Sequence, residues 1–216
     1  SNVYGQTDVP PAATNVIAIA AGEHHSLALR ADGIVVGWGR DTSGQATALS
    51  NAVNVLAISA GGNQSLALLA DSSTGGSIIT NDQARTPYYG PPPAEATNLL
   101  AVSAGYSHSL ALRADRTVTG WGLTNYAQLP VPSYAVNVLA LAAGGALSLG
   151  LVPDPAAPPI PPRIARPPLG RTVVAGQTTV FNALAAGGLP LRYQWYRDGA
   201  PAAGQTNAWL ALPNVL

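Results

Sequence analysis

Two histidines recur at matching places in this chain, and an imidazole can bind a metal ion or act as a general base near neutral pH. His25 and His108 each precede the same Ser-Leu-Ala-Leu segment. Around His108 the sequence reads Ser107-His108-Ser109, which sets two hydroxyl groups next to the ring. The residue types alone therefore allow metal binding, base catalysis or a serine nucleophile.

The spacing of these residues favours a structural role instead. Neighbouring residues on a strand point to opposite faces, and Ser107-His108-Ser109 has no flanking glycine of the kind a nucleophile elbow requires. In the other copies of the segment the histidine position holds Gln64 or Leu147. Glutamine can replace the hydrogen bond of an imidazole, so we interpret His25, Gln64 and His108 as structural hydrogen-bonding positions.

No other set of residues predicts an enzyme active site, a metal site or a cofactor. Gly37-Trp38-Gly39 lacks the third glycine of a dinucleotide-binding loop. Trp38 recurs as Trp121, which indicates packing. The acidic residues Asp32 and Asp115 stand singly in turns, so no pair of carboxylates suggests itself.

These residues belong to a repeat. The segment NVIAIAAGEHHSLAL begins at Asn15 and returns, with changes, from Asn54, Asn98 and Asn137, at spacings of 39, 44 and 39 residues. In the first unit an apolar run and a short alternating run lead to Asp32-Gly33, a hairpin turn, and then to a third strand, with room for a fourth near Gln45. About 40 residues with three or four short strands is typical of a propeller blade, although a solenoid has a similar period.

Composition narrows the possible classes of protein. Charged residues are 9% of the chain, the formal net charge is +0, and there are 23 glycines and 19 prolines, which fits an all-β protein with many turns. No lysine is present and no basic stripe exists, which argues against a nucleic-acid partner. The absence of cysteine excludes disulfides and thiol chemistry. No apolar run approaches the roughly 18 residues of a membrane span.

The units resemble the repeat of the regulator of chromosome condensation, a bladed β-propeller. The resemblance rests on AAGEHHSLALRADG (Ala20–Gly33), GWG (Gly37–Gly39) and Gly44-Gln45, and on their counterparts in the third unit, Ser103–Asp115 and Gly120–Gly122. It implies a partial propeller over residues 1–152. The whole units are 15–53, 54–97 and 98–136, and the half units are 1–14 and 137–152. The two half units could pair into a fourth blade, or the sequence is part of a longer chain, which we expect.

A proline-rich stretch, residues 153–168, is expected to be an extended linker, although proline-rich segments can also bind partners. The following residues, 169–216 with a beginning near 163, resemble a bacterial immunoglobulin-like module. Gly176-Gln177-Thr178, the YQWY segment around Trp195 and an Asp198-Gly199 turn carry this resemblance. It implies strands over Thr178–Leu184, Leu191–Arg197 and Trp209–Leu212.

In such a module Trp195 would be the buried tryptophan of the third strand, and Ala183 stands where a cysteine is usual. Only about 50 residues follow the linker, against about 100 in a complete domain. We therefore expect an incomplete sandwich with an open edge. Either the chain continues or a partner supplies the missing strands.

The second unit is irregular and is the best sequence candidate for a partner site. It lacks the Trp-Gly pair, and the stretch Ser72–Thr97 ends in a proline-stiffened loop with Arg85, Tyr88 and Tyr89. Tyrosine and arginine are common in binding hot spots. A degenerate blade with a tolerated insertion explains the same stretch.

Together these features predict an all-β chain, a partial propeller joined to an incomplete immunoglobulin-like sandwich. We expect a non-enzymatic binding, adhesion or scaffold segment of a secreted or cell-surface bacterial multidomain protein. Its partner would be a protein or glycan at the cell surface, and self-association is possible. The alternatives are a self-assembling filament or surface-layer protein and, from the propeller resemblance, a small-GTPase exchange factor or a secreted enzyme inhibitor.

Overall fold

The computed structural model describes most of the chain as strands and turns. The described residues are 1–70, 77–80, 90–123, 129, 131–132, 135–153, 161–168, 170, 173–176, 179–186, 191–206, 208–212 and 215. Every regular element among them is a β-strand. The described part contains no helix with the length and apolar character that a membrane crossing requires.

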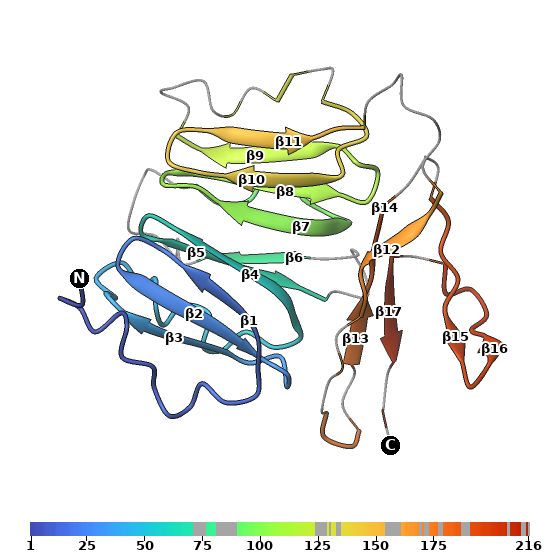
Figure 1. The fold of residues 1–216 in the computed structure, drawn as a ribbon, viewed down its shortest axis with the longest axis horizontal. Coiled ribbons are helices and arrows are strands. Elements are labelled where there is room, and N and C mark those ends of the chain that lie inside the picture. The colour runs from blue at the N-terminus through green and yellow to red at the C-terminus, as the bar shows by residue number, and fades with distance from the viewer. Residues whose placement is uncertain are drawn as a thin grey trace.

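Four consecutive antiparallel sheets follow the sequence repeat and stack side by side (Figure 1). The first three have three strands each and the fourth is a hairpin. Their bounds are β1 (Val16–Ala21), β2 (His25–Arg30), β3 (Val35–Gly39), β4 (Val55–Gly61), β5 (Gln64–Leu69), β6 (Ser77–Thr80), β7 (Leu99–Ala104), β8 (His108–Arg113), β9 (Val118–Gly122), β10 (Ala140–Ala143) and β11 (Ser148–Leu151). We call these sheets blades 1 to 4.

Each blade begins at an asparagine in the left-handed backbone region. The φ angles of Asn15, Asn54, Asn98 and Asn137 lie between 50° and 59°. Asparagine tolerates this conformation better than most side chains. The Asn15 carbonyl accepts a hydrogen bond from the Ala31 amide, which joins the entry of the blade to the β2–β3 turn. The left-handed backbone conformation at the start of each blade therefore explains why asparagine recurs there.

The connection from blade 1 to blade 2 is a turn and not a strand. The Asp41 carboxylate accepts hydrogen bonds from the amides of Ala46 and Thr47 and from the Thr47 hydroxyl. These bonds curl the segment between β3 and β4, so the possible fourth strand near Gln45 is not formed. Leu49 in this segment is fully buried between the two blades.

The core lies between blades, because successive side chains of each second strand face opposite neighbours. In blade 1, Leu27 and Leu29 pack towards blade 2, where Val55 and Ala67 meet them. Leu66 and Leu68 pack in the same way against Ala111 of blade 3. With its second strand, each of these blades thus presents leucines to the next blade and small residues to the preceding one.

Residues 1–14 and the hairpin of blade 4 do not complete one another. The carbonyl of Gln6 accepts hydrogen bonds from the Ser26 hydroxyl and the Trp38 indole, which holds the N-terminal segment against blade 1. Blade 4 lies at the other end of the stack (Figure 1). The alternative in which these two half units pair within one chain is therefore not what the structure shows.

The remaining strands form a second, smaller module. β12 (Arg163–Arg166) pairs with β14 (Leu184–Ala186), β13 (Thr179–Asn182) with β17 (Trp209–Leu212), and β15 (Tyr196–Arg197) with β16 (Ala200–Pro201).

The structure differs from the expected elements in three places. The expected linker contains β12, whose Ile164 is opposite Ala185 in the sheet. The strand expected over Thr178–Leu184 is interrupted at Ala183, and that expected over Leu191–Arg197 is regular only in β15.

A buried arginine joins the second module to the blades. Arg116 stands at the β8–β9 turn with a φ of 66°, where the corresponding turn of blade 1 has Gly33. Its side chain is 3% exposed, and Nη2 donates to the Ala185 carbonyl of the second module at 2.8 Å. Ala208 and Tyr193 pack nearby against Leu112. A non-glycine residue in this backbone conformation is strained, and here its side chain makes the docking contact.

We expect Arg116→Ala to loosen the second module while the blades stay folded. The variant loses a charged hydrogen bond to a buried carbonyl, worth about 1.5–3 kcal/mol. Amide hydrogen exchange in β12 and β14 should accelerate by about tenfold or more, and exchange in β2 and β5 should not change.

Arg116→Gly removes the docking side chain and also relieves the backbone strain at this turn, because glycine adopts the left-handed conformation freely. Comparison with the alanine variant therefore separates the two effects. The glycine variant should loosen β12 and β14 as much as the alanine variant does, with less destabilisation of the β8–β9 hairpin. Unchanged exchange in β12 and β14 for both variants would show that Arg116 does not dock the module.

Candidate functional site

The first position of each second strand links a blade to the next one. In blade 1, Nε2 of His25 lies 2.8 Å from the Ser65 hydroxyl of blade 2. Ser65 Oγ donates to the Gln45 carbonyl at 2.7 Å. Because the serine proton points to that carbonyl, Nε2 of His25 carries the ring proton and donates to Ser65.

The same link continues along the stack with different side chains. In blade 2, Nε2 of Gln64 donates to the carbonyls of Gly105 and His108, at 3.0 and 2.7 Å. The Ser109 hydroxyl donates to Gln64 Oε1 at 3.0 Å. In blade 3, Nε2 of His108 lies 3.0 Å from the Ser148 hydroxyl of blade 4. We call this series the interblade relay.

The relay explains a glycine three residues before each histidine. A Cβ atom at Gly22 would overlap the imidazole of His25, and one at Gly105 would overlap that of His108. The ring lies directly on the glycine backbone, so a larger residue would displace it. This pairing was not predicted from the sequence, although the Ala-Gly-x-x-His spacing shared by blades 1 and 3 is a visible signal.

Burial keeps both relay histidines uncharged at neutral pH. Desolvation lowers the pKa of His25 to about 4, and the Asp41 carboxylate opposes this only in part. Burial also lowers the pKa of His108, against a smaller opposing effect of a backbone hydrogen bond with Leu147. In both rings Nδ1 is buried without a hydrogen-bond partner, so a second proton would have no acceptor.

The positions considered for catalysis or metal binding are thus occupied by structural bonds. Ser109 bonds Gln64, and His108 faces Ser148, so Ser107-His108-Ser109 does not bring a base to its own neighbouring hydroxyls. Within the described ranges no three His, Cys, Asp or Glu residues gather to hold a metal ion. His24 lies at the surface, 3.7 Å from Glu23.

The tryptophans of the repeat have packing roles. The indole Nε1 of Trp38 donates to the Gln6 carbonyl at 2.9 Å. Trp121 is 7% exposed and packs with Leu66 and Leu68 between blades 2 and 3. Arg85, Tyr88 and Tyr89, the predicted partner-binding residues of the second unit, lie outside the described residues.

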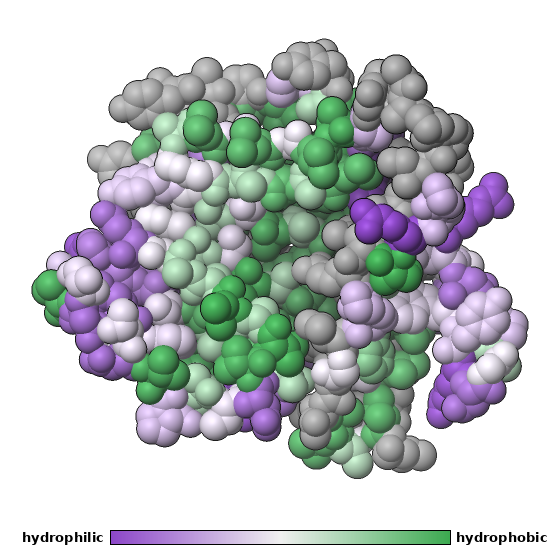
Figure 2. All heavy atoms as spheres, viewed as in Figure 1, coloured by the Kyte–Doolittle hydropathy of each residue, from purple (hydrophilic) through white to green (hydrophobic). Residues whose placement is uncertain are grey.

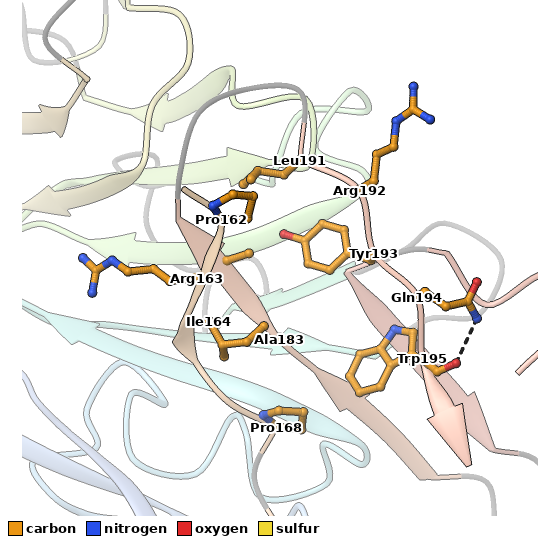
Figure 3. A pocket seen from close by; sticks show the side chains of 11 residues that line it. Pro162, Arg163, Ile164, Pro168, Ala183, Leu191, Arg192, Tyr193, Gln194 and Trp195 are labelled. Atoms are coloured by element: carbon orange, nitrogen blue, oxygen red, sulfur yellow. Dashed lines mark hydrogen bonds between the residues drawn. The ribbon is translucent and has the colours of Figure 1, made fainter. Parts of the chain in front are cut away.

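An open pocket of about 320 Å³ lies in the second module (Figure 3). β12 forms one wall, and the extended segment 191–195 forms the other. The lining residues are Pro162, Arg163, Ile164, Pro168, Ala183, Ala185, Leu191, Arg192, Tyr193, Gln194 and Trp195. We call this pocket the module groove.

The groove presents aromatic side chains inside and two cations at its rim. In Figure 3 the rings of Tyr193 and Trp195 point towards β12, while Arg163 and Arg192 point outwards. Ile164 on the facing strand is 56% exposed. An apolar cleft of this size with a few polar groups is typical of ligand sites.

Trp195 corrects one expectation from the sequence. It was expected as the buried tryptophan of an immunoglobulin-like core, but it is only half-buried and lines the groove. Two hydrogen bonds hold its main chain: the Trp195 amide donates to the Gln205 carbonyl, and the Trp195 carbonyl accepts from the Ala202 amide. The main chain at Trp195 is therefore held where its side chain lines the groove.

Comparison with known protein families supports the resemblance of the blades to a known propeller repeat. Residues 16–45 and 100–128 match the model of the Regulator of chromosome condensation (RCC1) repeat. These segments coincide with blades 1 and 3, whose Gly-Trp-Gly and His-Ser-Leu-Ala-Leu elements are intact. Among curated proteins none matches.

Solved structures with similar folds include two receptor-kinase ectodomains. The CRINKLY WD40 ectodomain of Arabidopsis thaliana ACR4 is 24% identical, with a TM-score of 0.52, over 63% of this chain and 46% of that one. The ectodomain of Physcomitrella patens CR4 is 24% identical, with a TM-score of 0.50, over 66% and 36%. Prp20p of Saccharomyces cerevisiae is 20% identical, with a TM-score of 0.47, over 63% and 43%.

The chain spans less than half the length of these three structures. The two ectodomains show the fold of the blades, and together with the repeat match they support RCC1-type propeller repeats in this chain, whose described residues form only strands as regular elements.

Replacing His25 by alanine should destabilise the chain more than replacing it by glutamine. Alanine leaves Ser65 without its donor and leaves a cavity beside Gly22, a loss of about 1–3 kcal/mol in the free energy of unfolding. Glutamine already occupies this position in blade 2 and should recover at least half of the loss. Urea denaturation followed by tryptophan fluorescence measures the difference. His24→Ala is the surface control and should stay within about 0.5 kcal/mol of the parent.

Acid should weaken the blades between about pH 6.5 and pH 4. In this window the unfolded chain binds a proton at His25, with an ordinary pKa near 6.5, whereas the folded chain does not until about pH 4. Folding stability is therefore complete above pH 6.5 and falls as the pH drops, by up to about 3 kcal/mol from His25. Denaturation midpoints measured across this range should fall less steeply for His25→Gln, and equal slopes would contradict the assignment.

Proposed function

We propose that this chain is a non-enzymatic, protein-binding segment of a secreted or cell-surface bacterial multidomain protein. The observation that carries the proposal is the module groove, in which Tyr193 and Trp195 border an open space of about 320 Å³. Tyrosine, tryptophan and arginine are the side chains most often responsible for binding energy at interfaces.

The partner we propose is an extended peptide segment of another protein. Both walls of the groove, β12 and residues 191–195, are extended backbone, and a peptide laid between them presents alternate side chains to the interior. Apolar side chains would fill the space beside Ile164 and Trp195. Acidic residues on the peptide would meet Arg163 and Arg192 at the rim.

A non-enzymatic role is supported by what the polar residues of the blades do. His25, Gln64 and His108 use their hydrogen-bonding groups between blades, and burial lowers the pKa of both histidines. The blades thus form a frame. Arg116 ties the second module to this frame, so a partner in the groove would be held by a rigid support.

Two observations support the extracellular setting: the similarity of the blades to solved ectodomains, and the second module. Two similar solved structures are receptor-kinase ectodomains, so blades of this kind occur outside cells. We further propose that the second module is an immunoglobulin-like sandwich. The antiparallel pairing of β12 with β14 and of β13 with β17 supports this arrangement.

A selection of displayed random decapeptides against the 216-residue chain tests the proposal. We expect peptides with alternating apolar residues and at least one acidic residue. Calorimetry with a selected peptide should show a loss of affinity of about tenfold or more for Trp195→Ala, because truncated aromatic anchors typically cost 2 kcal/mol or more.

Tyr196→Ala is the matched control, because Tyr196 is adjacent in sequence, 64% exposed and absent from the groove lining. It should leave the affinity unchanged. Equal effects of the two variants, or a failure to select any peptide that depends on Trp195, would show that the groove is not a peptide site.

A further inference from the structure

The aspartates in two blade turns are held by hydrogen bonds. In the β2–β3 turn, Oδ1 of Asp32 accepts from the Ile34 amide at 3.2 Å, and Oδ2 accepts from Nη2 of Arg30 at 2.6 Å. In the β8–β9 turn, Oδ1 of Asp115 accepts from the amide and the hydroxyl of Thr117, at 3.0 and 2.6 Å. Each carboxylate is therefore fixed within its own turn.

The main-chain amide after each of these aspartates is bonded as well. The Gly33 amide donates to the Arg30 carbonyl at 3.0 Å, and the Arg116 amide donates to the Arg113 carbonyl at 2.9 Å. Because a peptide group is planar, such a bond fixes the orientation of the whole group. The amide nitrogen is then unable to turn towards the carboxyl carbon of the aspartate before it.

The β15–β16 turn has the same Asp-Gly pair as the β2–β3 turn, but neither kind of bond. The Asp198 carboxylate lies 3.7 Å from Nε of Arg197, and these side chains are 92% and 80% exposed. Across the described part of the chain, no hydrogen bond is made by the Asp198 carboxylate or by the Gly199 amide. Figure 1 shows this hairpin projecting from the body of the chain, and Figure 2 shows hydrophilic residues over it.

The backbone of the β15–β16 turn also favours rearrangement. The φ angles of Asp198 and Gly199 are 50° and 81°, and left-handed backbone is unfavourable for a residue with a side chain. The flanking strands have two residues each, so few bonds oppose local opening. A Cβ atom at Gly199 would meet no atom within 4 Å. The space around this peptide bond is therefore open.

We propose that the Asp198–Gly199 peptide bond isomerises spontaneously to an isoaspartyl bond. The Gly199 nitrogen attacks Cγ of the Asp198 carboxyl group, so that an N–Cγ bond forms and a Cγ–O bond breaks. The amide proton and the departing hydroxyl leave as water, which closes a succinimide ring that glycine does not obstruct. Water then adds to Cγ, which restores aspartate, or to the Asp198 main-chain carbonyl carbon, whose bond to nitrogen breaks. The second outcome joins Gly199 through the side chain and requires no oxidant or reductant.

The product would alter one wall of the module groove. An isoaspartyl residue adds an atom to the main chain, so the turn between Arg197 and Ala200 would no longer match a two-residue hairpin. Beyond the turn, the Ala202 amide donates to the Trp195 carbonyl at 2.8 Å, and Nε2 of Gln194 donates to the Ala202 carbonyl at 2.9 Å. Isomerisation should weaken these bonds whether or not a partner binds in the groove.

The two Asp-Gly pairs provide a matched comparison within one molecule. The 216-residue chain is incubated in buffer for several weeks, and samples are digested and sequenced by electron-transfer mass spectrometry, which distinguishes isoaspartate from aspartate. We expect isoaspartate to accumulate at least about tenfold faster at Asp198 than at Asp32, because only the β2–β3 turn has both groups bonded. In guanidinium chloride, where both turns are unfolded, the two rates should agree within about threefold.

Asp198→Glu is the matched variant for the structural consequence. Glutamate keeps the charge, but its longer side chain would have to close a larger ring, so no isomer should accumulate. In the aged parent chain, amide hydrogen exchange at Ala202 should be about tenfold faster in the isomerised fraction. Exchange in the aged variant should stay at its initial value.

Equal rates at Asp198 and Asp32 in the folded chain would overturn the proposal. A faster rate at Asp198 that persists in guanidinium chloride would show that neighbouring residues, and not the turn, set the rate. Unchanged exchange at Ala202 in the isomerised chain would show that the β15–β16 turn does not hold the Trp195 segment.

Discussion

The contact between one blade and the next is the interaction on which the rest of the structure depends. A single blade has apolar side chains on both faces, with the leucines of its second strand on one of them, and neither face is buried until a neighbour packs on it. The interblade relay adds direction and register, because His25 or its counterpart reaches a particular serine of the following blade. Burial keeps these donors neutral, so they fit among leucines without a compensating charge.

Two kinds of surface remain outside this repeating contact. The ends of the stack, at Ile19 and at Leu149, carry the apolar character of the interior because each is half of an interior interface. The module groove differs, since it lies in the second module and the main chain of its Trp195 is held by bonds with Gln205 and Ala202 and not by a repeat. Arg116 connects the blades to the second module. It does so from a turn position with a positive φ angle, which a glycine would adopt with less backbone strain.

The sequence predicted the repeated strands because alternation and turn residues are local signals. The structural role of His25 and Gln64 could also be inferred, since a position that accepts either imidazole or amide indicates hydrogen bonding. The turn after β3 could not, because it depends on three bonds to Asp41. Arg116 was missed although Ala-Asp-Arg replaces Ala-Asp-Gly in blade 3, because only the packed structure shows what the arginine reaches. The half-buried state of Trp195 likewise depends on neighbouring strands.

The close packing of glycine on histidine restricts the order in which these positions can evolve. At Gly22 a methyl group would strike the His25 ring, so an exchange of the glycine requires prior loss of the ring. At Gly61 the obstacle is the backbone of the next blade, and no change within the unit removes it. Of the four glycines at this repeat position, Gly22, Gly61, Gly105 and Gly144, only Gly144 would place a Cβ atom with no other atom closer than 4.0 Å. Drift at this position in related sequences would therefore mark the unit that had lost its neighbour, and strict retention would mark one that still has it.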